Sequence, residues 1–180
     1  MNVARKYTLL FYVLSLWGLT AGSARAELAF AEYKIKAVYI YRLTNFIRWD
    51  NASAAAPIFC TLGQDNTTAT LTALLSQNAN IEPVRQMHNL EEADHHCDLL
   101  YITEEKLHAL HTLPQYPGLL TISDSADTLQ SGGMIELRTL GQQIKPVLSL
   151  LNIEKNNLSV SSQLLRIAII SPPQDNVFQS

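Results

Sequence analysis

Residues 97–123, CDLLYITEEKLHALHTLPQYPGLLTIS, decide the fold class. An apolar strand at 97–102 is followed by Thr103, a residue type that caps helix N-termini, and by a helix that runs to Leu110. A second apolar strand follows at 118–123. Apolar strands that alternate with helices are typical of a parallel sheet covered on both faces.

The same alternation continues on both sides of this stretch. Residues 57–63 predict a strand, 67–77 a helix, and 81–87 an edge strand. Two strands within 133–151 predict a β-hairpin, and 161–168 predict a last amphipathic helix. The sequence therefore predicts an α/β fold, with a mostly parallel sheet flanked by helices on both faces and an antiparallel C-terminal hairpin at the edge.

The segment 32–49 predicts an amphipathic helix, because its apolar residues recur every three or four positions. The expected stripe contains Ile35, Val38, Tyr39, Leu43, Phe46 and Ile47, and leaves out Lys34, Lys36 and Arg48. The segment has more apolar residues than one stripe needs. The surplus predicts either an interface that includes Tyr41 and Trp49, or burial on two sides.

The first 26 residues have the pattern of a secretory signal peptide. Arg5 and Lys6 precede an apolar run from Tyr7 to Leu19, and residues 24–26 read Ala-Arg-Ala. The alternative is a retained membrane anchor, but the run is shorter than the roughly 18–20 residues that span a bilayer. We expect a cleaved signal peptide at 1–26, a single domain at 27–171, a flexible tail at 172–180, and a periplasmic location.

The charge of the predicted mature chain argues against nucleic acid. Cleavage would remove three of the 13 basic residues and none of the 16 acidic ones, which leaves 10 against 16. No basic cluster remains to neutralise phosphates or to bind an anionic membrane surface. Nucleic acid is therefore excluded as an expected partner.

The only two cysteines are Cys60 and Cys97, and both lie in the predicted mature part. An even count in an exported chain favours one disulfide, and the alternative is a pair of buried free thiols. In a doubly wound sheet the strands that carry them can be neighbours. The pairing and the strand assignment therefore support each other.

No enzyme motif is present. Residues 63–66 lack the glycines of a dinucleotide or phosphate loop, and Ser123 and Ser125 are not in a nucleophile elbow. Asp124 follows a strand, where active sites often form, but a lone aspartate there more often caps a turn. Five histidines fall within 88–111 without a ligand-spacing motif, so we expect no metal or other cofactor. We predict that the chain is not an enzyme.

Arginines offer the remaining ligand chemistry. Arg48 and Arg166 could hold an aromatic or anionic metabolite, which would make the chain a small-molecule sensor. Salt bridges and solvated faces are the alternative role for such side chains.

Six short motifs in a fixed order resemble the YfiR-like family of periplasmic proteins. They are 32–37 EYKIKA, 45–49 NFIRW, 59–63 FCTLG, 97–102 CDLLYI, 121–124 TISD with 132–135 GGMI, and 161–168 SSQLLRIA. The resemblance covers nearly the whole predicted mature chain.

The resemblance implies a repressor of a membrane-bound diguanylate cyclase. Such a regulator binds the periplasmic sensor region of the cyclase and lowers cyclic-di-GMP signalling, and an outer-membrane lipoprotein sequesters it. A homodimer and redox sensitivity through the disulfide are also implied. Residues expected to contact the partner are Tyr41 and Trp49 in the first helix and Leu164 and Leu165 near the end.

Overall fold

The computed structural model describes residues 23–49 and 56–173, with side chains from residue 32 onward. The chain divides into two compact units, residues 1–32 and 33–180. Of the first unit, the structure describes helical backbone from Ser23 and the side chain of Glu32. Residues 1–22 of the predicted signal peptide and residues 174–180 of the predicted tail therefore lie outside the described residues.

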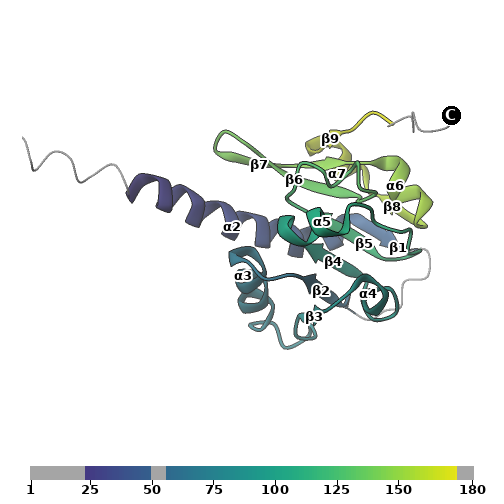
Figure 1. Ribbon diagram of the computed structural model, residues 1–180, viewed down its shortest axis with the longest axis horizontal. Helices are drawn as coiled ribbons and strands as arrows, with labels where there is room; N and C mark the ends of the chain where they lie inside the picture. Colours follow the sequence, from purple (N-terminus) through teal and green to yellow (C-terminus); the bar gives the residue numbers. More distant parts are fainter. Residues whose placement is uncertain (1–22, 50–55, 174–180) are drawn as a thin grey trace, which may run out of the picture. The chain divides into compact units, whose positions relative to one another are not determined.

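The predicted α/β class is confirmed. A seven-stranded sheet has the order β3-β2-β4-β5-β6-β7-β9. Its strands are β2 (Phe59–Leu62), β3 (Arg85–Met87), β4 (Leu99–Ile102), β5 (Leu120–Ser123), β6 (Ile135–Leu140), β7 (Gln143–Leu148) and β9 (Ile169–Ile170). All neighbours in this sheet are parallel except β6 and β7, which form the predicted hairpin (Figure 1). A separate antiparallel pair joins β1 (Ile47–Trp49) to β8 (Leu158–Val160).

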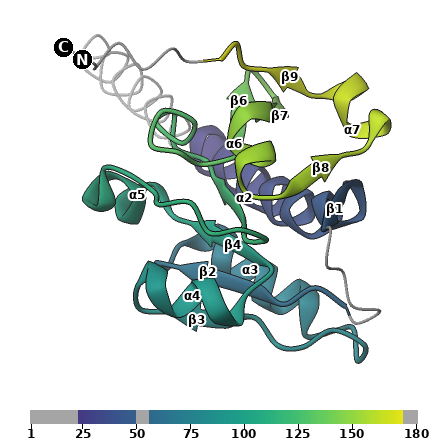
Figure 2. The ribbon, with the colours of Figure 1, turned by 90° about the vertical axis from the view of Figure 1, so that its right-hand side faces the viewer.

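Helices cover both faces of the sheet, as predicted (Figure 2). One face packs on α2 (Ser23–Leu43), α3 (Asn66–Leu75), α6 (Leu150–Lys155) and α7 (Ser162–Ile167). The other face packs on α4 (Leu90–His96) and α5 (Glu104–Leu110). The strands at the centre of the sheet, β2, β4 and β5, are buried along their whole length, which explains their continuous apolar sequences.

The predicted helix over 32–49 is wrong in its C-terminal third. Helix α2 ends at Leu43, a short 3-10 turn η1 (Thr44–Phe46) follows, and Ile47 begins strand β1. The chain leaves the helix because 47–49 pair with β8, more than 100 residues away. Helical periodicity cannot indicate such a distant pairing.

The predicted buried stripe of α2 is also partly wrong. Ile35 and Val38 are 41% and 39% exposed, whereas Lys36, expected on the solvent side, is only 8% exposed. The face that packs on the sheet carries Ala37 and Ile40, which are fully buried. Leu43 of the predicted stripe is buried in the same core, so the face that packs on the sheet overlaps the predicted stripe at the C-terminal end of the helix and departs from it at Ile35 and Val38.

Two further elements differ from the expectations. The predicted strand to Leu151 ends at Leu148, because Ser149 caps α6 by accepting a hydrogen bond from the amide of Asn152. Residues after α7 form the short strand β9, which adds to the outer side of the hairpin through its pairing with β7.

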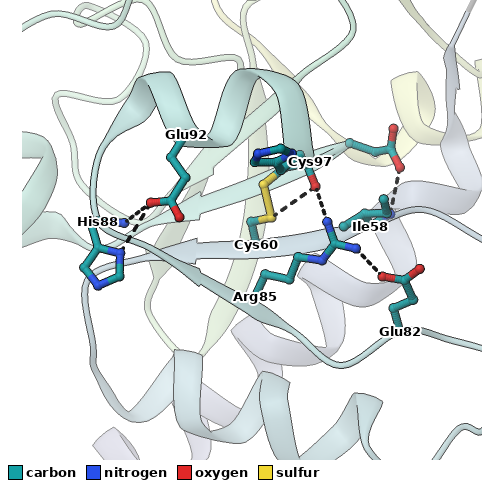
Figure 3. The surroundings of a disulfide bond; sticks show 9 residues. Ile58, Cys60, Glu82, Arg85, His88, Glu92 and Cys97 are labelled. Carbon is teal, nitrogen blue, oxygen red and sulfur yellow. Dashed lines mark hydrogen bonds and ion pairs between the residues drawn. A yellow bond between two sulfur atoms is a disulfide. The ribbon is translucent and has the colours of Figure 1, made fainter.

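The predicted disulfide between Cys60 and Cys97 is present (Figure 3). Their Cα atoms are 5.9 Å apart, since β2 and β4 are neighbours in the sheet. Around it, the Asp98 carboxylate accepts a 2.7 Å hydrogen bond from the amide of Ile58, and Arg85 reaches the carbonyl of His96. The disulfide thus fixes the start of β4 against β2, at the point where the chain leaves α4.

Candidate functional site

The small β1–β8 sheet brings together the two segments that the sequence proposed for partner contact. Arg48 pairs with Ser159, and Trp49 with Leu158. Ser161, which follows β8, donates its amide to the carbonyl of Phe46 at 2.8 Å and accepts the N-cap hydrogen bond of α7. The end of the first segment and the start of the last therefore form one structural unit.

The two aromatic candidates are partly buried and have structural contacts. Trp49 donates its indole N–H to the carbonyl of Gly118 at 2.8 Å. The ring of Tyr41 lies 6.3 Å from that of Phe59 in a tilted arrangement, which is an aromatic contact within the core. Each ring therefore supports the fold and leaves only part of its surface to a partner.

The two leucines of α7 have opposite environments. Leu164 is fully buried in the main core, so it has no surface through which it could contact a partner. Leu165 is 38% exposed. The sequence could not separate these neighbours, because consecutive helix positions differ by about 100° and both are leucine.

Exposed apolar side chains concentrate near the C-terminus. Of the nine large apolar side chains that are exposed in the described residues, six lie within 150–170. We call the following six the C-terminal apolar surface: Leu150, Leu151, Leu165, Ile167, Ile169 and Ile170. These six side chains lie on α6, α7 and β9, and exposed apolar side chains that form one patch are typical of a site that contacts another molecule.

The candidate ligand arginines are exposed and lie on different elements. Arg48 is on β1, and Arg166 is in the last turn of α7. Among the residues that the structure describes, neither forms an ion pair. Their proposed role in holding a ligand stays a prediction.

A buried polar cluster lies at the carboxyl end of the sheet. Lys36 of α2 forms a 2.8 Å ion pair with Asp124, and their side chains are only 10% and 16% exposed. Tyr101 on β4 donates its hydroxyl to Asp65 at 3.2 Å. Asp65 also caps α3, since its carboxylate accepts the amide of Thr68. The cluster joins α2, α3, β4 and β5, so its first role is to hold these elements together.

Two loops lie in close contact at the place where doubly wound proteins bind ligands. In such sheets the ligand site lies at the carboxyl ends of the strands where the order reverses, here between β2 and β4. Gly63 ends β2 with a φ of +95°, and a Cβ atom there would lie 2.1 Å from the Oγ1 of Thr103. The loops after β2 and β4 are therefore packed against each other at Gly63.

A serine, a histidine and an aspartate also meet, but not as a catalytic triad. His108 Nε2 lies 3.2 Å from the hydroxyl of Ser125 and 3.3 Å from the carboxylate of Asp127. A triad needs the serine and the acid on opposite ring nitrogens, whereas here both contact the same one. Ser125 is also fully buried. In the part of the chain that the structure describes, no three potential ligand side chains are placed to hold a metal ion.

The comparison with protein-family models identifies the family of this chain. The YfiR/HmsC-like model matches residues 33–169, which is most of the chain. The chain belongs to the YfiR/HmsC-like family. No curated protein matches the sequence significantly.

Membership in the YfiR/HmsC-like family is consistent with a periplasmic regulator of a diguanylate cyclase, and the family is regulatory rather than catalytic. Across residues 23–49 and 56–173, no helix combines the length and hydropathy needed to cross a bilayer.

The buried tyrosine of this YfiR/HmsC-like protein gives a prediction at high pH. Burial raises the pKa of Tyr101 far above its ordinary value, and the carboxylates of Asp124 and Asp65 raise it further. Below about pH 10 the tyrosine is neutral in both states, so its contribution to stability is complete. Above that pH the unfolded chain loses the proton and the folded chain does not, so the stability falls by up to about 1.4 kcal/mol per pH unit.

We therefore expect Tyr101→Phe to remove most of the alkaline decline in the free energy of unfolding. Urea denaturation between pH 9 and pH 11 measures this decline, where the range follows from the ordinary tyrosine pKa of about 10. If the free energy of unfolding fell equally with pH in wild type and variant, Tyr101 would titrate alike in the folded and unfolded states.

Proposed function

We propose that this protein is a periplasmic negative regulator, which binds the periplasmic sensor region of an inner-membrane diguanylate cyclase and lowers cyclic-di-GMP signalling. The match of the YfiR/HmsC-like model over residues 33–169 carries the proposal. The mechanism is differential binding, because a regulator shifts its target only if it binds the inactive state more tightly than the active one.

The disulfide supports this location. Cytoplasmic thiols are kept reduced, whereas exported domains commonly contain a disulfide. Cys60 and Cys97 form one within a single domain. An outer-membrane lipoprotein that sequesters the regulator, and a homodimer as its active form, complete the proposal.

The C-terminal apolar surface is the face that we assign to the cyclase. It has exposed leucines and isoleucines on α6, α7 and β9. To this face we add the exposed parts of Trp49, on strand β1, and of Tyr41, on helix α2. Burial of several such side chains on binding contributes about 25 cal/mol for each Å² of apolar surface removed from water.

We expect Leu165→Asp to weaken binding to the periplasmic region of the cyclase by at least about tenfold, since a carboxylate placed in an apolar interface loses its hydration. Stability should change little, because Leu165 is exposed. Calorimetric titration of the purified sensor region with the exported protein measures the affinity.

The matched control is Leu140→Asp. Leu140 is also exposed, at 46%, but it lies at the tip of the β6–β7 hairpin. The control should bind as wild type does. If Leu140→Asp lost affinity and Leu165→Asp kept it, the hairpin would be the contact surface, and if the wild type did not bind at all, the proposed function would fail.

A further inference from the structure

An open groove of about 750 Å³ lies between helix α3 and strand β3. Strand β3 forms one edge of the seven-stranded sheet, and β9 forms the other (Figure 1). None of the six residues of the C-terminal apolar surface lines the groove, and neither candidate arginine does. The groove is therefore a separate feature of the domain.

Strand geometry places the side chain of Thr61 on the floor of the groove. Successive side chains of a strand point to opposite faces of the sheet. Cys60 and Leu62 of β2 pack in the core beneath α4 and α5. Thr61 therefore points to the other face, which carries α3, and it is one of the residues that line the groove. Gln86 lies directly beside it, because the register of β2 and β3 pairs these two residues.

The wall opposite β3 is one side of α3. Asn66, Ala69 and Thr72 line the groove at every third position of this helix, a spacing that places them on the same side. The two walls are also joined, because the side-chain amide of Gln64 donates to the Oε1 of Gln86 at 2.9 Å. The position of α3 relative to β3 is therefore set before a ligand enters.

The hydroxyl of Thr61 lacks a partner. Thr61 is only 4% exposed, and its hydroxyl forms no hydrogen bond with any residue that the structure describes. The hydroxyl of Thr121 on β5 is also unpaired, but its oxygen is enclosed, whereas Thr61 lines an open groove. A nearly buried polar group without a partner costs about 1–3 kcal/mol. A ligand in the groove would supply the missing hydrogen bond.

Charge restricts the ligand. Asp65 is the only ionisable residue in the lining. Its two carboxylate oxygens already accept hydrogen bonds, from the amide of Thr68 and from the hydroxyl of Tyr101. An anion would therefore face a carboxylate and find no positive side chain in the lining. The groove favours an uncharged ligand.

The other polar groups of the lining suit a ligand with many hydroxyl groups. The side-chain amides of Gln64, Asn66 and Gln86 each carry donors and an acceptor, as a sugar hydroxyl does. The C–H groups of a sugar ring can pack on the apolar atoms of Ala69 and Val84. The volume lies within the range of roughly 300–1,000 Å³ that is typical of small-molecule sites.

We propose that this groove binds an uncharged saccharide, which forms a hydrogen bond with the hydroxyl of Thr61 and others with the amides of Asn66 and Gln86. This inference goes beyond the proposed function, because it rests only on α3, β2 and β3 and needs no cyclase.

The test is an NMR titration of the isotope-labelled exported protein with maltotriose and with cellotriose. The form of each sugar that has a carboxylate in place of every C6 hydroxymethyl group is the anionic comparison. We expect at least one uncharged trisaccharide to shift the amide signals of residues 61–72 and 84–86. Its anionic form should bind at least about tenfold more weakly, because of repulsion by Asp65.

Thr61→Val should weaken the binding of that trisaccharide by about tenfold, since one hydrogen bond is lost. The free energy of unfolding in urea should stay equal or rise, because the hydroxyl that is removed has no partner in the free protein. Thr121→Val is the matched control, a strand threonine with an unpaired hydroxyl outside the groove. It should bind the trisaccharide as wild type does.

Several results would overturn the proposal. They are the absence of shifts with both uncharged trisaccharides, shifts confined to residues outside the groove, equal binding of the anionic form, and unchanged binding by Thr61→Val. A clear loss of stability in Thr61→Val would also overturn it, since the hydroxyl would then have a partner in the free protein. A wild type that binds the saccharide but not the sensor region of the cyclase would refute the proposed function alone.

Discussion

Replacement of Cys60 and Cys97 by serine is expected to lower the free energy of unfolding by about 4 kcal/mol. The disulfide closes a loop with a sequence separation of 37 residues. In the chain-entropy model, a loop of this length restricts the unfolded chain by roughly that amount. For a domain of this size, such a loss lowers the melting temperature by about 8–16 °C. Thermal denaturation of wild type and the double variant measures it.

The same protein under reducing conditions provides the control. A thiol reductant should lower the melting temperature of wild type toward that of the double serine variant, and it should leave the variant unchanged. We expect reducing conditions to relieve the repression of cyclic-di-GMP signalling for the same reason, through loss of the regulator's fold. A wild-type melt that does not respond to the reductant would show that the disulfide contributes nothing to stability.

Lys36→Met is expected to destabilise the fold by about 3–5 kcal/mol, which is the range for removing one partner of a buried ion pair. Asp124 would then remain largely buried without its counter-charge. Its other carboxylate oxygen accepts no hydrogen bond from the described residues, so it offers no compensation. Urea denaturation at neutral pH measures the change.

A second substitution separates the contribution of the ion pair to stability from the contribution of side-chain packing. Lys36→Met combined with Asp124→Leu removes both charges, so the double variant should recover much of the stability that Lys36→Met loses. Lys106→Met, at an exposed position of α5, should change the stability by less than about 0.5 kcal/mol. Additive losses in the double variant would mean that the two side chains do not interact.

The central part of the fold was predictable because its signals are local. Strands β2, β4 and β5 are buried on both faces, and each appears in the sequence as a short apolar run before a helix cap or a turn. The disulfide followed from the same assignment, because the two cysteine-bearing strands are neighbours in this type of sheet. The hairpin was predictable from two adjacent strand patterns.

The errors occurred where distant residues decide the local structure. Strands β1, β8 and β9 have only two or three residues each, and they exist through pairing with remote partners. On α2, two faces carry helically spaced residues, and the sheet packs on the one that includes Lys36. Local periodicity cannot indicate this choice, because Asp124, the partner of Lys36, is 88 positions away in the sequence.

The candidate site was predictable at the level of segments and not of side chains. The sequence selected both the end of the first segment and 161–168, and the β1–β8 pairing joins them. It could not separate the buried Leu164 from the exposed Leu165.

The central claim is that this protein lowers cyclic-di-GMP signalling from the periplasm. Its most direct test is the cellular concentration of cyclic-di-GMP in a deletion strain that is complemented with wild type, Leu165→Asp or Leu140→Asp. We predict a rise on deletion, which wild type and Leu140→Asp reverse and Leu165→Asp does not. An unchanged concentration on deletion, under several growth conditions and with the cyclase present, would contradict the claim.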